Sequence, residues 1–421
     1  MCVALPTQDV ARRPAPLPPG ARNFLLRNRL IREGWSSCRG WQCEHDYRRR
    51  REMYAKLAEE RNLVYDRERV GAEVRRRISG RNYTVRQRRP GEIHTFAFIP
   101  QIAWHASLLP DLRELGPLTL FDYTSLGFKD QAAVGFGAAG LAQRAAYNAL
   151  VLPALLKAHR ERPVDWFVAY ASGLELSRDT IRKIVEETGI PTVGICFDDK
   201  QSWIGYGMGD HRAGQIDLAP VFDLSWTSAR VACEWYLVEG GRPVYLPEGF
   251  DACTFKPQAV TPDIDVSFVG AAYGRRPSII QALRRAGIEV RTFGSAWKGS
   301  DWEPDPFRIM SRSLINLGMG YVGYSGRLTN VKGRDFEIPA VGGGVYLTTY
   351  NSDLAQHFRI GEEILCYKDL DEMVELIRYY LKHRQGAHEI AIRGRERCLA
   401  EHRWLHRYLA ICEILGIGIF N

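Results

Sequence analysis

The sequence predicts an α/β protein with two doubly wound parallel-sheet domains in tandem, preceded by a basic, mainly helical extension. Apolar runs of five to seven residues alternate with helical segments twice along the chain, which indicates parallel strands joined by crossover helices. A stretch with Pro and Gly and little periodicity separates the two rounds. The first 90 residues hold 22 Lys and Arg against 10 Asp and Glu, whereas the rest of the 421-residue chain has a net charge of −4.

Composition narrows the class of protein. The hydrophobic fraction of 45% and the charged fraction of 25% are those of an ordinary globular protein. No apolar run approaches the roughly 18 residues of a membrane span, and the N-terminus lacks a signal-peptide pattern, so we expect a cytoplasmic protein. The nine cysteines are scattered and therefore predict reduced thiols. Cys38, Cys43 and His45 have no second ligand pair at zinc-finger spacing, so no metal is expected there.

The basic extension covers residues 1–90. Its first 20 residues are Pro-rich and predict an extended tail, and a helical pattern follows from residue 22 to residue 79. The four arginines 48–51 suit peripheral contact of residues 22–90 with an anionic membrane or an acidic partner. Nucleic acid is a weaker candidate because aromatic residues are sparse and no binding motif appears. The favoured alternative is a helix that packs on the main body through apolar residues, namely Met53, Tyr54, Leu57 and Leu63.

Residues 91–250 predict the first domain. Predicted strands occupy 94–100, 118–122, 164–170, 192–197 and 223–227, and predicted helices occupy 140–160, 177–188 and 229–239. Ligands of such domains bind at the carboxyl ends of the strands. This places the loop with Trp104 and His105, and the loop with Asp198 and Asp199, at the edge of the expected site.

A glycine motif in this domain, residues 135–140, matches the G-x-G-x-x-G fingerprint of dinucleotide-binding proteins and precedes a helix. The fingerprint requires a strand immediately before it, and residues 127–134 do not read as one. We therefore interpret the glycines as a tightly packed helix entry.

Residues 251–400 predict the second domain, which follows an interdomain linker at 245–257. Predicted strands occupy 264–270, 289–293, 314–317 and 345–348, with a helix that ends near residue 286 and a helical stretch over 370–415. Residues 401–421 are expected to form a C-terminal helix that crosses back to the first domain. Two hinged α/β domains would enclose a central cleft, a preferred place for a ligand.

The stretch from Asn330 to Thr349 is the most informative one. It predicts a short helix, a Gly-rich turn and a buried strand, with Thr329 or Asn330 as helix cap. Lys332 and Arg334 add positive charge where helix amides favour an anion. Glu337 lies one turn after Arg334, so the two side chains share a face. This arrangement suits a nucleoside diphosphate, with a surface helix of mixed charge as the alternative, and residues 342–344 would let the backbone turn beside the ligand.

The same stretch carries a family resemblance. Arg334-Asp-Phe-Glu-Ile-Pro-Ala-Val-Gly-Gly resembles the R-x-F-E-x-x-A-x-G-G signature of the CgeB-like branch of GT-B glycosyltransferases. Phe268-Val-Gly, Phe293-Gly-Ser-Ala-Trp, Leu246-Pro-Glu-Gly-Phe-Asp and His402-Arg-Trp-Leu-His-Arg are similar to further family motifs in the same order. The likeness extends over residues 94–415 and is strongest in the second domain.

The resemblance implies a GT-B fold, a nucleotide-sugar donor bound by the second domain and an acceptor bound by the first. Glu337 would accept hydrogen bonds from the ribose, and Arg334 would orient it or reach a phosphate. Arg275, Arg276 and Lys332 would face the diphosphate, so that neither a metal nor another cofactor is implied. Gly270 and Gly343 lie in two of the matching motifs and complete the expected donor set.

One departure leaves the stereochemistry open. Related retaining enzymes carry a carboxylate eight residues before the one that matches Glu337, and here that residue is Thr329. An inverting enzyme would need a general base, for which His105 and Asp198 are the candidates; each has a purely structural alternative. The departure also permits a catalytically inactive, nucleotide-binding or regulatory module with the same fold.

Overall fold

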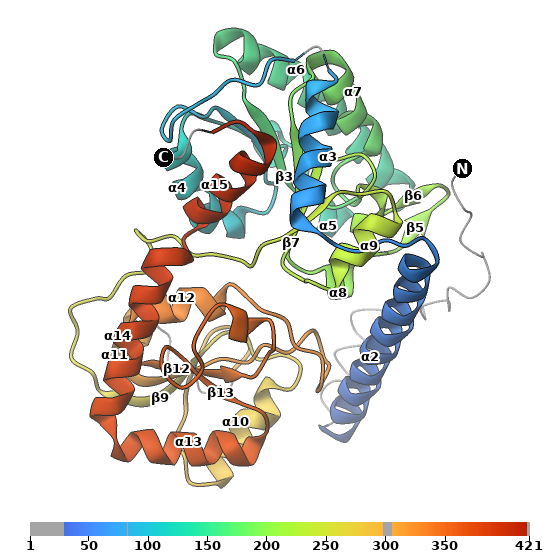
Figure 1. Ribbon diagram of the computed structural model, residues 1–421. Helices are drawn as coiled ribbons and strands as arrows, with labels where there is room; N and C mark the ends of the chain where they lie inside the picture. The colour runs from blue at the N-terminus through green and yellow to red at the C-terminus, as the bar shows by residue number, and fades with distance from the viewer. Residues whose placement is uncertain (1–28, 82, 298–304, 419–421) are drawn as a thin grey trace.

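The computed structural model describes residues 29–418 except 82 and 298–304, so the predicted Pro-rich tail lies outside the described residues. The chain forms two α/β lobes, one above the other in Figure 1. A long helix, α2 (Arg29–Glu60), runs beside both of them.

The upper lobe contains a six-stranded sheet in which all neighbouring strands are parallel, in the order β2-β1-β3-β4-β7-β8. Its strands are β1 (Thr95–Phe98), β2 (Leu118–Phe121), β3 (Trp166–Tyr170), β4 (Thr192–Cys196), β7 (Leu224–Thr227) and β8 (Pro243–Tyr245). The helices of this lobe are α4 (His105–Leu115), α5 (Gln131–Val134), α6 (Ala138–Glu161), α7 (Arg178–Thr188), α8 (Asp199–Ser202) and α9 (Ala232–Val238). A small antiparallel hairpin, β5 (Gly207–Met208) and β6 (His211–Arg212), projects from it.

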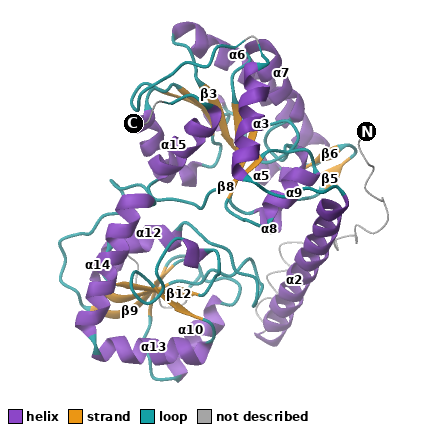
Figure 2. Ribbon diagram, in the orientation of Figure 1, coloured by secondary structure: helices purple, strands orange, loops and turns teal. Residues whose placement is uncertain are grey.

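The lower lobe repeats this plan with a five-stranded parallel sheet in the order β10-β9-β11-β12-β13. Its strands are β9 (Ile264–Val269), β10 (Arg291–Phe293), β11 (Ser313–Leu317), β12 (Val345–Thr349) and β13 (Leu365–Tyr367). Its helices are α10 (Arg276–Arg285), α11 (Pro306–Arg312), α12 (Arg334–Val341), α13 (Leu370–Lys382) and α14 (Arg384–Glu401). Figure 2 shows helices on both sides of each sheet, as a doubly wound fold requires.

Two doubly wound domains are therefore what the alternating pattern predicted, and the fold class is confirmed. Differences concern short elements. The segment that begins with His105 is a helix rather than a loop. The strands β8 and β13 and the helix α11 were not predicted, and β8 ends at the first residue of the predicted linker. The glycine motif at 135–140 follows α5 rather than a strand, and a methyl group on Gly140 would lie 2.2 Å from the Gly135 carbonyl oxygen, so it is a packed helix entry.

The chain crosses between the lobes a second time near its C-terminus. Helix α15 (Trp404–Leu415) packs against α4 and against α3 (Arg67–Ser79), and Trp404, Tyr408 and Ile411 are buried in the core of the first lobe. Helix α3 contributes Val70 and Val74 to the same core. Part of the basic extension is thus structurally part of the first domain.

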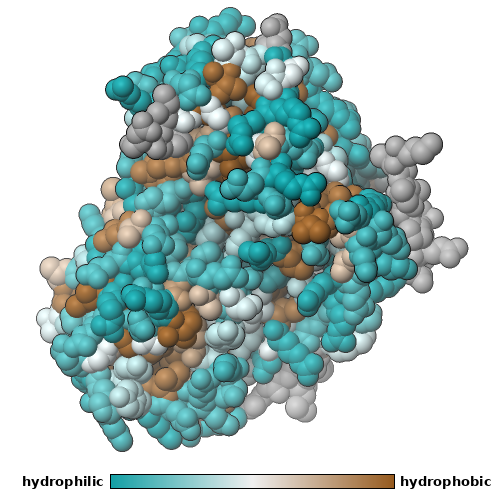
Figure 3. Space-filling model, in the orientation of Figure 1, coloured by the Kyte–Doolittle hydropathy of each residue, from teal (hydrophilic) through white to brown (hydrophobic). Residues whose placement is uncertain are grey.

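Helix α2 packs on α9 and α8. Tyr54 and Ala58 are buried in a cluster with Trp203 and Trp235, and Leu57 and Leu63 pack around it, as the packing alternative predicted, while Met53 is exposed. In the face drawn in Figure 3, apolar residues form several separate groups, and the surface over α2 is mostly hydrophilic. Within the described part of the chain, no helix has both the length and the apolar character needed to cross a membrane.

Candidate functional site

Each sheet has one point where the strand order reverses direction. In the first sheet it lies between β1 and β3, and in the second between β9 and β11. Loops that leave neighbouring strands diverge there, which makes the carboxyl ends of those strands the usual ligand site of such folds. Hydrogen bonds between the loop after β4 and the loop before α12 show that the two carboxyl edges face each other; in one of them Asn330 Nδ2 donates to the Phe197 carbonyl oxygen at 3.2 Å.

The start of α12 is the centre of this interface. Gly333 is the N-terminal cap and has no side chain to bond the free amides, so the predicted cap by Thr329 or Asn330 is wrong. Two carboxylates take the place of a capping side chain at this helix start. The Lys332 amide donates to Asp335 Oδ2 at 2.7 Å, and the Gly333 amide donates to Glu248 Oε2 at 2.9 Å. The positive end of the helix is therefore an anion site that protein carboxylates already contact.

Lys332 links the two domains. Its ammonium group lies 2.8 Å from Asp198 Oδ1, which belongs to the loop after β4. Burial alone would lower the pKa of Lys332, but Asp198 and Glu248 outweigh burial and raise it. Lys332 therefore stays charged, and Asp198, a predicted catalytic residue, contacts a predicted donor-binding residue across the interface.

Glu248 was missed by the sequence reasoning. It lies in the linker after β8, is 3% exposed, and its pKa is raised well above the ordinary value by burial. A methyl group on Gly333 would lie 2.9 Å from Glu248 Oε2 and 3.5 Å from Glu337 Oε1, so the two carboxylates converge there. The motif Leu246-Pro-Glu was recognised as a linker, but only the fold brings it to α12.

The remaining donor residues surround this point. Arg334 Nε lies 3.5 Å from Glu337 Oε2, the pairing on one helix face that their spacing predicts. Burial raises the pKa of Glu337, and Arg334 opposes that shift. Arg276 stacks on Tyr273 at 4.1 Å, and its pKa is lowered by burial and by the charge of Arg334.

The two glycines of the predicted set have different locations. Gly270 directly follows β9 at the reversal point, where its carbonyl oxygen accepts a hydrogen bond from Trp297 Nε1 at 2.7 Å. Gly343 precedes β12 at the opposite edge of the sheet, where a methyl group on it would lie 2.3 Å from Ser311 Cα. Gly343 thus permits close packing of the turn on α11, and the structure does not bring it to the donor residues.

His105 is the first residue of α4 and follows β1 at the reversal point of the first sheet. Its Nε2 lies 2.7 Å from the carbonyl oxygen of Ile99. Because a carbonyl can only accept, Nε2 carries the proton, which leaves Nδ1 of the neutral ring as the atom able to take one. The neighbouring Trp104 packs edge-on against Tyr170 and Trp404.

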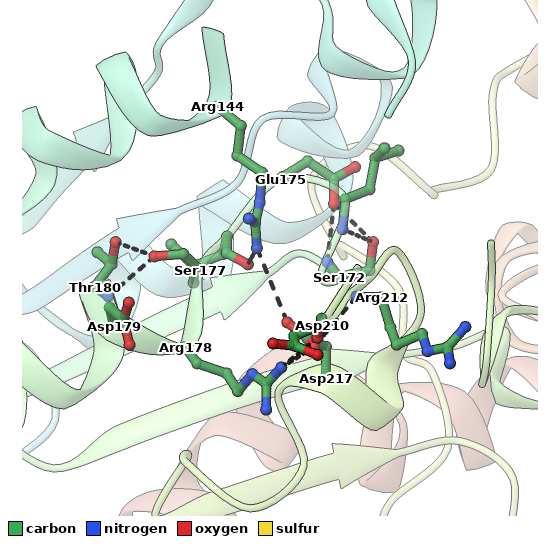
Figure 4. Close-up of polar contacts among 12 residues, drawn as sticks. Arg144, Ser172, Glu175, Ser177, Arg178, Asp179, Thr180, Asp210, Arg212 and Asp217 are labelled. Atoms are coloured by element: carbon green, nitrogen blue, oxygen red, sulfur yellow. Dashed lines mark hydrogen bonds and ion pairs between the residues drawn. The ribbon is translucent and has the colours of Figure 1, made fainter. Parts of the chain in front are cut away.

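A polar cluster follows β3 at the same reversal point (Figure 4). Glu175 is 7% exposed and accepts hydrogen bonds from the amide and hydroxyl of Ser172 at 2.9 and 2.8 Å. Burial raises its pKa. Asp217 pairs with Arg178 at 3.0 Å and lies 3.9 Å from Arg144, so one carboxylate is shared by two guanidinium groups of this cluster.

Comparison with known proteins agrees with this geometry. Residues 275–413 match a family model described as glycosyl transferase-like. Among solved structures, a glycosyltransferase from Rickettsia africae ESF-5 has a TM-score of 0.52 at 9% identity, over 77% of this chain and 99% of that one. Anabaena HepE in complex with UDP has a TM-score of 0.50 at 12% identity, over 77% of this chain and 100% of that one. No curated protein matches by sequence.

The matched segment contains every predicted donor residue except Gly270 and begins at Arg275. The two structural likenesses cover both lobes and show a common fold. The chain therefore has the two-domain GT-B architecture, and its second domain is glycosyl transferase-like in sequence.

Proposed function

We propose that the protein is a glycosyltransferase that moves a sugar from a nucleoside diphosphate sugar to an acceptor. The observation that carries the proposal is the convergence of Arg275, Arg276, Lys332 and Arg334 at the β9–β11 reversal point and the start of α12. A carboxylate, Glu337, lies one turn into that helix. Cations and helix amides bind a diphosphate, and a carboxylate accepts hydrogen bonds from ribose hydroxyls.

In the reaction, the bond between the anomeric carbon and the diphosphate oxygen breaks, and the diphosphate leaves with the electron pair. The anomeric carbon forms a new bond to an acceptor oxygen, whose proton passes to a base. Positioned cations stabilise the negative charge that develops on the leaving group, so we propose that the reaction needs no metal ion. The matching motifs favour the CgeB-like branch, and the UDP complex of HepE favours UDP as the first nucleotide to test.

Calorimetric titration with UDP, GDP, ADP, CMP and dTDP tests the donor site. We expect one of them to bind with micromolar affinity and Glu337→Gln to weaken that binding roughly 10-fold or more, because hydrogen bonds to a charged group are lost. Glu375→Gln, an exposed carboxylate on α13, is the matched control. Absence of binding by every nucleotide would overturn the proposal, and binding without sugar transfer would instead favour an inactive module.

The base is tested separately, because two candidates come from the first domain. Asp198→Asn or His105→Gln should lower kcat by about 10²–10⁴ while UDP still binds, if the changed residue accepts the acceptor proton. Asp198 contacts Lys332 directly, whereas His105 is held by Ile99. Losing UDP affinity in proportion to kcat would show a binding role instead, and unchanged kcat in both variants would favour a retaining reaction without either base.

A further inference from the structure

Helix α2 touches both domains. Its C-terminal half is fixed to the first domain through Tyr54, whose ring packs on Trp203 and Trp235 and whose hydroxyl donates to Glu239 at 2.7 Å. Its N-terminal half reaches the second domain, in the loop of residues 318–333 between β11 and α12. This loop leaves the carboxyl end of β11 and carries Lys332, so it borders the donor site.

Glu44 makes the direct contact. Its Oε1 accepts from the Ser325 hydroxyl at 2.7 Å and from the Gly326 amide at 3.0 Å. Although burial opposes the change, these hydrogen bonds lower the pKa of Glu44. Ser325 is fully buried, and its oxygen accepts in turn from the amides of Arg327 and Leu328 at 3.0 and 2.8 Å. One carboxylate of α2 thus orients the hydroxyl that holds the turn together.

The backbone approach depends on a glycine. A methyl group on Gly40 would lie 2.6 Å from the Tyr324 carbonyl oxygen, closer than contact distance. Glycine inside a helix is destabilising, so its presence here fits a requirement for close approach. A methyl group on Gly326 would lie 1.9 Å from Arg275 Nη1, so the turn held by Glu44 also packs against Arg275, a predicted diphosphate-binding residue.

A second path connects the same elements. Arg50, the one arginine of the 48–51 run that is not exposed, donates to the Lys200 carbonyl oxygen at 3.1 Å. The Lys200 ammonium group donates to the Thr329 carbonyl oxygen at 2.8 Å. The loop is therefore held at two points, at Ser325 by α2 itself and at Thr329 through α8.

We infer that α2 is an intramolecular strap in which Glu44 positions the donor-side loop 318–333 against the first domain. Glu44 is a positioning residue, because its carboxylate acts through Ser325 and Gly326. The effect of the strap on donor binding rests on the proposed function, whereas its effect on the position of the loop does not. The exposed arginines 48, 49 and 51 then form the solvent face of a packed helix.

The test uses point variants of the full chain, because deletion of α2 would expose Trp203 and Trp235. Glu44→Ala removes the oxygen that accepts both hydrogen bonds, whereas Glu44→Gln keeps an oxygen that can accept from Ser325 and Gly326. Gly40→Ala pushes the helix from the loop. The matched controls are Glu52→Ala, an exposed carboxylate of α2, and Gly386→Ala, where the nearest atom, in Tyr380, lies 4.0 Å from the added methyl group.

Hydrogen–deuterium exchange of residues 320–333 is the first measurement. Glu44→Ala and Gly40→Ala should speed exchange there by roughly three- to tenfold while the core strands stay protected, with Glu44→Gln intermediate. The second measurement is binding of UDP, which should weaken by a similar factor in the same order. Exchange in Glu44→Ala equal to that in Glu52→Ala would overturn the strap.

The two proposals fail in different ways. Faster loop exchange without UDP binding by the wild-type protein would support the strap and contradict the proposed function. Unaltered loop exchange in the variants together with UDP binding by the wild-type protein would contradict the strap and support the proposed function. A third outcome would favour a membrane-docking helix in place of the strap. In it, the protein sediments with vesicles of anionic phospholipid, changing arginines 48 and 49 to Ala abolishes this sedimentation, and exchange in Glu44→Ala is unaltered.

Discussion

The two sheets have the same strand order around their reversal points and different side chains at their carboxyl edges. The first-domain edge carries the carboxyl groups of Glu175, Asp198 and Glu248, and Asp217 pairs there with Arg178. The second-domain edge carries Arg275, Arg276, Lys332 and Arg334, of which Arg275 and Arg334 are exposed. One scaffold thus presents carboxyl groups from one domain and a group of cations from the other to a single interface.

This difference indicates that the side chains at each edge, and not the topology of the sheets, determine which ligand each domain suits. Both edges offer the loop divergence that a ligand needs. Only the second offers exposed positive charge beside a helix N-terminus, which a diphosphate requires. The first edge offers carboxyl groups and the His105 imidazole, which suit hydroxyl groups and proton transfer. The difference between the two edges is therefore tested by changing the charge at one edge while the fold is kept.

Lys332→Ala should have the largest effect. The ammonium group belongs to the residue before the Gly333 cap of α12 and contacts Asp198 at the opposite edge, so its loss should lower kcat of the proposed transfer by about 10²–10³. Release of UDP from UDP-sugars in the presence of acceptor measures this. Lys256→Ala, at an exposed position in the linker, is the control, and a loss of less than threefold would mean that the cationic edge does not serve the leaving group.

The sequence was sufficient to predict this asymmetry only in part. Short apolar runs predicted the strands because parallel strands are buried on both faces, and the spacing of Arg334 and Glu337 predicted their pairing. Spacing could not show that Glu248, 85 residues before Gly333, lies against that helix. Nor could it show that α2 reaches Ser325, since both contacts depend on the packing of separate elements.

The errors have local causes. Gly343 belongs to a conspicuous Gly-rich turn, but α12 carries the chain from the carboxyl edge to the amino edge before that turn is reached. The strand β13 has three residues, too few to show alternation, and Pro110 lies inside α4 and weakens its helical pattern. The caps predicted at Thr329 and Asn330 are wrong because α12 begins later, with Gly333 as its cap, and Asp335 and Glu248 bond the amides of Lys332 and Gly333.

Acidification should loosen the hinge that holds the two edges together. His402 lies where α14 ends, its backbone oxygen accepts from the linker amide of Phe250 at 3.2 Å, and its Nδ1 accepts from Arg407 Nη2 at 2.8 Å. Burial and the charge of Arg407 lower the pKa of His402 to about 2. The unfolded chain, with a histidine pKa near 6.5, binds a proton first, so stability present above that value is lost as the pH falls.

Between pH 7 and pH 5 this one histidine should cost about 2 kcal/mol of unfolding free energy. Denaturant unfolding at both pH values measures the loss. His402→Gln should be less stable than wild type at pH 7, because it cannot reproduce both the contact of Nδ1 with Arg407 and that of Nε2 with the His357 carbonyl oxygen at 3.1 Å, yet less sensitive to acid. An equal loss in wild type and variant would place the acid sensitivity elsewhere, with the neighbouring His357, whose pKa burial lowers to about 4, as the next residue to change.

The smallest expected effect is a gain in UDP affinity, whereas the other changes lower activity or stability. Glu248 accepts from the Gly333 amide and lies beside Lys332, two groups that a bound diphosphate would also use. A carboxyl group there competes with phosphate for the amide, and its ionised form repels a phosphate. Glu248→Gln keeps an acceptor for the amide and cannot ionise, so at a pH where Glu248 is ionised UDP should bind the variant roughly three- to tenfold more tightly. Calorimetry measures this, with Glu337→Gln, which should weaken binding, as the contrasting variant. Weaker binding in Glu248→Gln would mean that the anionic edge helps to hold the donor, and the division of charge between the two domains would no longer separate their roles.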